Sequence, residues 1–295
     1  MRDPNEMAPS SDVARPMVSA RDLRKSYRGK AALDGASFSI RAGRIVGLIG
    51  PNGAGKTTAI KAMLGLTRVE GELRVMGLDP FAQREQLMEE VCFIADVAIL
   101  PRWARAKDLI DYTDGVHKKF DRKKCEAFLA GTDVKLNARV GELSKGMIVQ
   151  LHLALIMAID AKLLVLDEPT LGLDILYRKR FYEQLLGDYF DESRTILITT
   201  HQVEEIEPIL TDVLFINHGK IVLNAPMEEL SDRYVQLNVE SAQIEAARAL
   251  GPVSERKLLG KSQMLFDGVD RERLKTFGEL SPPSLSELFV ATMSR

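Results

Sequence analysis

Cysteine is scarce in this sequence, whose 295 residues contain only Cys92 and Cys125. The two residues lie in different segments and lack the spacing of a metal site, which argues against a fold built on disulfides or a cysteine-held metal. We interpret them as unpaired thiols of a reduced, cytosolic protein.

The sequence also lacks a clear excess of positive or negative residues. Lys and Arg number 40 and Asp and Glu 42, which gives a formal net charge of −2. Such a chain has no net positive charge that would attract nucleic acid or anionic lipid. We therefore expect no nucleic-acid partner. Hydrophobic residues at 45% and charged residues at 28% are ordinary for a globular protein.

Long apolar runs are absent from the sequence. The longest, such as LALIMAI at Leu153–Ile159, are far shorter than the roughly 20 residues that cross a bilayer. The first segment, MRDPNEMAPSSDVARP, is polar and lacks the apolar core of a signal peptide. We expect residues 1–17 to form a disordered tail, and a separate chain to span the membrane if the protein works at one.

Strand and helix patterns alternate from Val18 onward. LDGASFSI at 33–40 alternates in polarity, and GRIVGLIG at 43–50 is a continuous apolar run typical of a buried parallel strand. Residues 56–66 have helical spacing. A strand, a glycine-rich turn and a helix therefore follow one another, which is the setting that a phosphate-binding loop requires.

The rest of the chain continues this alternation. Helical patterns cover about 105–130 and 144–159, and a further helix is expected at 175–186. Strands are expected at 162–168 and 194–201, followed by a hairpin that turns at His218-Gly219-Lys220. This order predicts an α/β core with a parallel sheet and a helical insertion.

A mixed α+β tail follows Ala225-Pro226 and ends in the apolar stretch SLSELFVATM. A helix in this last stretch needs a surface to cover. It either folds back on its own domain or seals a dimer, and the sequence leaves both open.

A phosphate-binding loop is encoded at residues 50–57, which fit the pattern G-x-x-x-x-G-K-[ST] in full. Glycines allow the backbone N–H groups to approach phosphate closely, and the following helix adds its positive end. Lys56 should reach the β- and γ-phosphates, and the Thr57 hydroxyl should bind Mg²⁺. The expected nucleotide contacts are Gly50, Pro51, Asn52, Gly53, Ala54, Gly55, Lys56, Thr57 and Thr58.

An acidic pair ends the predicted strand LLVLDEPT. Asp167 and Glu168 come at its carboxyl end, where open α/β sheets bind their ligands. Two carboxylates beside an apolar strand are costly unless something pairs with them. We expect Asp167 to hold Mg²⁺ through water and Glu168 to polarise the water that attacks the γ-phosphate.

Three further motifs accompany the loop and the acidic pair. They are LSKGM at 143–147, LGLD ending in Asp174, and His201 at the end of a strand. In this order and spacing, over residues 18–225, the chain resembles the ATP-binding cassette family of transporter ATPases. The resemblance is closest to exporter cassettes whose membrane subunits are separate chains.

The resemblance implies a fold in three parts after the tail. The nucleotide-binding domain would cover 18–225, with a P-loop (RecA-like) parallel-sheet core, an antiparallel β subdomain and a helical subdomain at about 97–160. A small α+β extension would cover 226–295 and serve regulation or dimerisation.

The resemblance also implies a head-to-tail dimer, most simply a homodimer, with two ATP molecules between the cassettes. One chain's signature segment covers the ATP on the other chain's phosphate loop. The Ser144 hydroxyl, the Gly146 backbone and the positive helix terminus there suit a phosphate. The signature residues are Leu143, Ser144, Lys145, Gly146 and Met147.

Other roles are carried over by position. Tyr27 would stack on adenine, His201 would contact the γ-phosphate, and Asp174 would link the two sites across the dimer. Asp96 stands where the family usually has Gln, or Glu in many exporters. Its position implies a reach toward Mg²⁺ and the attacking water, although with a shorter side chain. Trp103 would either line a groove for the membrane partner or, as we expect, pack in the core.

These observations predict an ATPase subunit that uses ATP and Mg²⁺ and drives the separate multi-spanning permease of an exporter. It would act from the cytoplasmic face of the cell membrane. A regulatory or mechanical membrane complex would carry an identical cassette and stays open as the alternative. Ribosome-bound relatives carry two cassettes and DNA-repair relatives a long coiled coil, whereas this chain has neither. A GTPase would need an Asn/Thr-Lys-x-Asp motif, which is absent.

Overall fold

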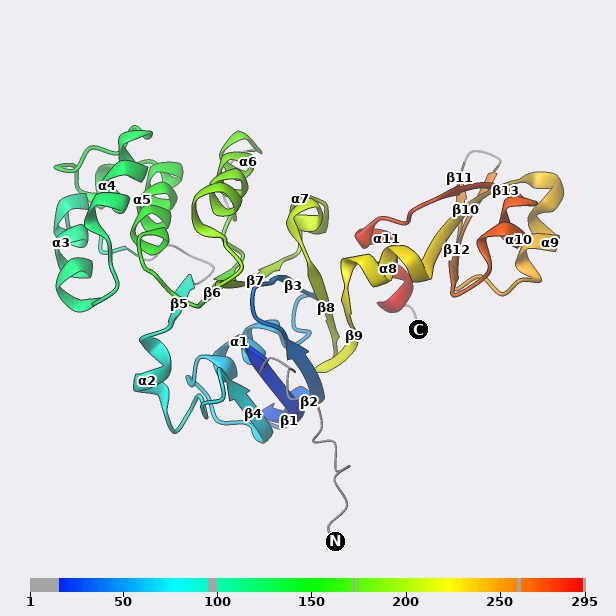
Figure 1. The fold of residues 1–295 in the computed structure, drawn as a ribbon, viewed down its shortest axis with the longest axis horizontal. Coiled ribbons are helices and arrows are strands. Elements are labelled where there is room, and N and C mark those ends of the chain that lie inside the picture. Colours follow the sequence, from blue (N-terminus) through cyan, green and yellow to red (C-terminus); the bar gives the residue numbers. More distant parts are fainter. Residues whose placement is uncertain (1–15, 95–99, 172, 174, 259–260, 294–295) are drawn as a thin grey trace, which may run out of the picture.

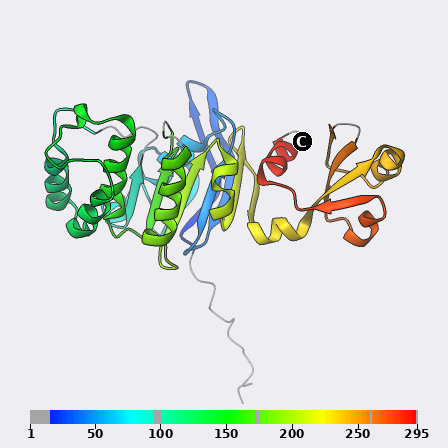
Figure 2. The same ribbon diagram turned by 90° about the horizontal axis from the view of Figure 1, so that it is seen from above.

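The computed structural model describes residues 16–94, 100–171, 173, 175–258 and 261–293. It is elongated, with a helical region at one end, the central sheet in the middle and the C-terminal extension at the other end (Figures 1 and 2). Most of the tail expected at 1–17 lies outside the described residues. Met17 is buried, and its carbonyl accepts the Met76 N–H at 2.7 Å.

The central sheet has the strand order β5-β6-β7-β3-β8-β9, parallel except for the last pair. Every residue of β3, β6 and β7 is buried, because helices and loops cover both faces of the sheet. The predicted parallel α/β core is confirmed. Its strands are β3 (Ile45–Ile49), β5 (Val91–Ile94), β6 (Leu163–Asp167), β7 (Thr195–Thr200), β8 (Asp212–Asn217) and β9 (Lys220–Pro226).

An antiparallel sheet with the order β2-β1-β4 packs over α1 and one face of the central sheet. Leu23 and Leu33 share its buried cluster with Val46 of β3 and Ile60 of α1. This is the antiparallel subdomain that the resemblance implies. The elements are β1 (Val18–Tyr27), β2 (Lys30–Ile40), α1 (Lys56–Met63), β4 (Glu70–Val75) and α2 (Arg84–Met88).

The helical region has a core of its own, which includes Ile110, Cys125 and Leu151. Asp121 caps its second helix by accepting the Lys124 N–H at 3.1 Å, and Ser144 caps its third. The helices are α3 (Ala106–Val116), α4 (Arg122–Ala130) and α5 (Lys145–Met157). In the chain, α6 (Ile175–Gln184) precedes β7 and α7 (Val203–Ile206) follows it. A π-helical turn continues α6.

The C-terminal extension begins with α8 (Met227–Arg233) and then follows a β-α-β-β-α-β order. Its sheet has the strand order β11-β12-β10-β13 with every neighbouring pair antiparallel, which is the ferredoxin-like arrangement. The predicted α+β character is thus confirmed. The elements are β10 (Tyr234–Glu240), α9 (Ile244–Arg248), β11 (Ser254–Leu258), β12 (Lys261–Asp267), α10 (Arg271–Lys275) and β13 (Gly278–Ser281).

The last helix, α11 (Leu285–Met293), folds back on its own chain. Leu288 is buried in the main core, and the rings of Phe289 and Phe215 meet edge to face at 5.3 Å. The Leu285 N–H donates to Glu207 at 2.9 Å, just after α7. Of the two possibilities left open by the sequence, the structure therefore has the helix covering its own domain.

Candidate functional site

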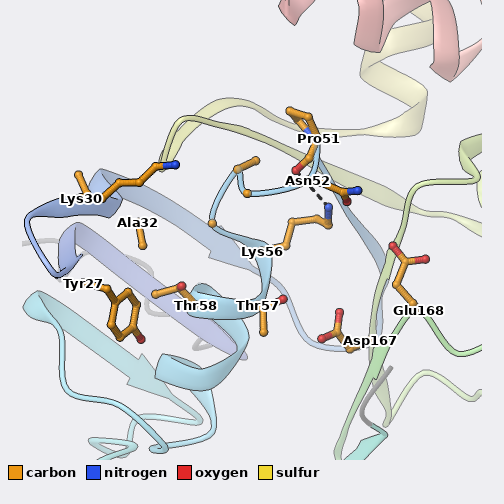
Figure 3. A pocket seen from close by; sticks show the side chains of 14 residues that line it. Tyr27, Lys30, Ala32, Pro51, Asn52, Lys56, Thr57, Thr58, Asp167 and Glu168 are labelled. Carbon is orange, nitrogen blue, oxygen red and sulfur yellow. Dashed lines mark hydrogen bonds between the residues drawn. The ribbon is translucent and has the colours of Figure 1, made fainter. Parts of the chain in front are cut away.

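A pocket of about 390 Å³ lies at the carboxyl ends of β3 and β6. Tyr27 stands at one end, Glu168 at the other, and the loop after β3 runs between them (Figure 3). The structure thus brings the phosphate loop, the acidic pair and Tyr27 into one cavity. The lining residues are Tyr27, Lys30, Ala31, Ala32, Pro51, Asn52, Gly53, Ala54, Gly55, Lys56, Thr57, Thr58, Asp167 and Glu168.

The loop conformation depends on its glycines. Gly55 has φ 114°, and a Cβ on it would lie 2.4 Å from the carbonyl oxygen of Ala32. A Cβ on Gly50 would lie 2.4 Å from the carbonyl oxygen of Ile216. Any larger residue would push the loop off β2 and β8, so the glycines fix where its N–H groups point.

A distant hairpin turn supports the loop from behind. The Gly219 N–H donates to the Ala54 carbonyl at 2.8 Å, and the Gly219 carbonyl accepts the Asp34 N–H at 2.9 Å. His218 and Gly219 both have positive φ, 46° and 77°, as a tight two-residue turn requires. The sequence predicted this turn but gave no sign that it contacts the phosphate loop.

Lys56 is the buried cation of the pocket, with 8% of its surface exposed. Its Nζ donates to the Gly50 carbonyl at 2.6 Å and, more weakly, to the Pro51 carbonyl at 3.4 Å. Burial lowers the pKa of Lys56, and the nearby charges of Glu168 and Asp167 act against that shift. A bound phosphate would favour the charged form in the same way, so the ammonium suits an anionic ligand.

Asp167 and Glu168 face the loop from the end of β6 (Figure 3). Asp167 is 7% exposed, and its carboxylate accepts the hydroxyl of Thr199. Glu168 has φ 50°, and its Oε2 lies 2.9 Å from His201 Nδ1. His201 directly follows β7, so neighbouring strands bring together two residues that are far apart in the sequence.

The oxygen donors near Thr57 suit a hard cation that also binds phosphate. Within the described part of the chain, no cluster of three or more His, Cys, Asp and Glu side chains that could hold a metal is found. Magnesium in nucleotide sites needs only one or two protein ligands, because phosphates and water supply the rest. One hydroxyl, from Thr57, and one buried carboxylate, from Asp167, fit that requirement.

The signature residues lie elsewhere, at the start of α5. None of them lines the pocket of their own chain. Leu143 is buried, whereas Ser144 and Lys145 are exposed, and the Ser144 hydroxyl accepts the Met147 N–H at 3.2 Å. Gly146 is half-buried with room beside it, since a Cβ there would come no closer than 4.0 Å to the Ser144 hydroxyl oxygen.

Three further residues singled out in the sequence are Asp96, Asp174 and Trp103. Asp96 and Asp174 lie outside the described residues. The expectation that Trp103 packs in the core is wrong, since it is 79% exposed in the turn before α3. The small neighbours Ala104 and Ala106 take the buried positions there.

Sequence reasoning missed several residues around the site. Lys30, Ala31 and Ala32 line the pocket, and their place beside Tyr27 at a strand turn was the only available signal.

Arg178 links the segment after the acidic pair to the segment after His201. It donates to the Leu173 carbonyl at 2.8 Å and to Glu205 at 2.6 Å. Thr199 carried no signal, because threonine is common in strands.

Comparison with known proteins agrees with this geometry. The family described as ABC transporter matches residues 33–171. The chain is 30% identical over 297 residues to the Nod factor export ATP-binding protein I of Rhizobium etli, covering 93% of this chain and 92% of that one. It is 33% identical to the protein of that name from Ralstonia nicotianae, over 82% and 78% of the two chains.

A solved structure described as the ATP binding subunit of an ABC transporter has the same fold, with a TM-score of 0.66 at 21% identity. The matched region covers 73% of this chain and 92% of the solved one. The predicted fold is thereby confirmed. This chain belongs to the ABC transporter ATP-binding family, whose members bind and hydrolyse ATP, work with a membrane permease and dimerise.

Proposed function

We propose that this chain is the ATP-hydrolysing subunit of a membrane exporter and drives a separate multi-spanning permease from the cytoplasmic face of the cell membrane. The observation that carries the proposal is that the phosphate loop faces Asp167 and Glu168 within one pocket. The relatives that span most of this chain are named for export, which supports the direction of transport. Each helix in the part of the chain that the structure describes is too short or too polar to span a bilayer.

The nucleotide would lie along the pocket from Tyr27 to Glu168. The exposed ring of Tyr27 stacks on adenine, while the loop N–H groups and Lys56 hold the phosphates. Thr57, and Asp167 through water, would hold Mg²⁺, whose positive charge would offset the negative charge of the phosphates. This arrangement orders the γ-phosphate next to the acidic end of β6.

Glu168 acts there as the base for the attacking water. Its carboxylate borders the pocket. His201, 2.9 Å away, orients that carboxylate and would also contact the γ-phosphate. Asp96 and Asp174 keep the roles proposed from their positions in the sequence, Asp96 toward Mg²⁺ and Asp174 across the dimer.

Two copies of the chain pair head to tail. The separation of the signature segment from the pocket of its own chain supports this pairing. Ser144 and Lys145 are exposed at a helix N-terminus, and neither lines that pocket. Each signature then covers the ATP of the partner. We assign nucleotide binding to residues 18–225, with the helical subdomain at about 97–160, and a role in regulation or dimerisation to the extension at 226–295.

A pull-down tests the proposal. The tagged Glu168→Gln variant is expressed in its own host, and solubilised membranes are purified with ATP and Mg²⁺ present. A Lys56→Ala variant, which loses the phosphate anchor, serves as the control. We expect a multi-spanning protein in near-stoichiometric amount with Glu168→Gln and less of it with Lys56→Ala.

A second copy of the chain, carrying a different tag, reports on the homodimer in the same preparation. Recovery of both tags together supports it, and recovery of a different cassette contradicts it. Ribosomes, nucleic acid, or a dimer found only in the soluble fraction would overturn the exporter assignment.

A further inference from the structure

Thr199 lies at the centre of the site although it does not line the pocket. It is fully buried on β7, which runs between the strand of the phosphate loop and the strand of the acidic pair. In the sheet register it sits opposite Leu48 on one side and Asp167 on the other. No other position on β7 is opposite Asp167.

The hydroxyl of Thr199 contacts both acidic residues. It donates to Oδ1 of Asp167. A hydroxyl has only one hydrogen to donate. In its other contact the Thr199 oxygen therefore acts as the acceptor, for the Glu168 N–H at 3.3 Å. The Thr199 carbonyl accepts the same N–H at 3.0 Å. One residue therefore holds a carboxylate and the following backbone at once.

The backbone at Glu168 needs such a hold. Its φ of 50° is the left-handed region, which is unfavourable for a residue with a side chain. Successive strand residues point to opposite faces, yet Asp167 and Glu168 both border the pocket. The left-handed turn at Glu168 ends the alternation, and the Thr199 bonds stabilise the turn.

We propose that Thr199 is a positioning residue for the reaction, which fixes the Asp167 carboxylate toward the metal and the Glu168 backbone toward the attacking water. This rests on the proposed roles of Asp167 and Glu168. Groups that hold a metal ligand in place typically change metal affinity or activity by about 10- to 100-fold when they are removed.

Neighbouring threonines provide a matched control. Thr195 is equally buried at the other end of β7, and its hydroxyl accepts the Gly43 N–H at 3.0 Å. Thr195→Val therefore removes a buried strand hydroxyl without touching the acidic pair. Thr199→Val removes the hydroxyl at nearly constant volume, and Thr199→Ser keeps it.

The first measurement is binding of a fluorescent ATP analogue, with excess chelator and then with graded Mg²⁺. We expect Thr199→Val to bind the analogue like the wild type without metal and to need about 10- to 100-fold more Mg²⁺ for the tighter complex. Its kcat should fall with little change in KM measured at saturating Mg²⁺. Thr199→Ser and Thr195→Val should stay close to the wild type. Should Thr199→Val fail to fold, Thr199→Ala against Thr199→Ser gives the same comparison.

Three outcomes would overturn the inference: a folded Thr199→Val with wild-type Mg²⁺ dependence, a Thr199→Ser as impaired as Thr199→Val, or the same loss in Thr195→Val. Asp167→Asn separates this failure from that of the proposed function. If Asp167→Asn loses the Mg²⁺ dependence while Thr199→Val keeps it, only the role of Thr199 is wrong. If Asp167→Asn behaves like the wild type, the metal role of Asp167 is wrong, and the inference falls with it.

Discussion

The Nδ1 atom of His201 lies 2.9 Å from Oε2 of Glu168. The two side chains come from the ends of adjacent strands, β7 and β6, and they differ in exposure: 51% for His201 and 16% for Glu168. The histidine therefore stands on the open side of the carboxylate. A group that reached Glu168 from solvent would meet His201 beside it.

Replacing Glu168 by Gln should lower ATP turnover by roughly 10²–10⁴, the usual contribution of a general base. ATP binding should persist, because the loop and Lys56 are unchanged. Phosphate release and nucleotide affinity measured on the same preparation check this. Turnover equal to that of the wild type would contradict the role of Glu168 as the base.

His201→Ala should also lower turnover, and its effect should not add to that of Glu168→Gln. Because the two side chains are in contact, the second change acts on a site that the first has already disabled. The double variant should therefore turn over ATP about as slowly as Glu168→Gln alone. Fully multiplicative losses would mean that the 2.9 Å contact carries no shared function.

Two glycines of the loop offer a matched pair. Gly53→Ala and Gly55→Ala both place a side chain at positive φ, at a cost of about 1–2 kcal/mol each. Only at Gly55 does the new Cβ meet backbone, at 2.4 Å from Ala32 O, whereas the space at Gly53 is open. We expect Gly55→Ala to weaken ATP affinity by at least about tenfold more than Gly53→Ala, a difference of about 1.4 kcal/mol. Calorimetry checks the pair, and equal losses would refute the packing argument.

The two thiols should react slowly in the folded protein. Burial raises the pKa of both Cys92 and Cys125 to about 12, and only the thiolate is a good nucleophile. At pH 8 alkylation should therefore be on the order of 10³ slower than for a free cysteine, and its rate should still rise with pH above 9. Timed labelling with and without urea checks this. Labelling at the free-thiol rate in the folded protein would contradict the burial.

The contact of α11 with the core should contribute to stability. Leu288 is 5% exposed, so Leu288→Ala should lower the free energy of unfolding by about 2–5 kcal/mol. Val290 on the same helix is 62% exposed, and Val290→Ala should change it by less than about 0.5 kcal/mol. Urea unfolding of both variants measures the difference. Equal effects would show that α11 is not docked in solution.

The local features of this protein were predictable from its sequence. The apolar run of β3, the glycine pattern of the loop and the turn at His218-Gly219 each depend on a few adjacent residues. Their chemistry determines local conformation directly, because only a few residue types tolerate a positive φ or a fully buried strand.

What depends on the order of strands in the sheet was not predictable. Thr199 contacts Asp167 only because β7 lies between β3 and β6, and Gly219 contacts Ala54 only because β8 follows on the other side. The position of α11 is of the same kind, since its partners around α7 and Phe215 come from distant segments. No spacing along the chain encodes these contacts.

The central place of β3 has a consequence for biosynthesis. Its two neighbours begin at Thr195 and Asp212, and the turn that supports the loop is at Gly219. At about 5–20 residues per second, the ribosome delivers the first of these partners roughly 8–30 seconds after β3 itself. The strand that carries the phosphate loop is thus made early and paired late, and a nascent chain acquires its nucleotide pocket only when nearly the whole ATPase core has emerged.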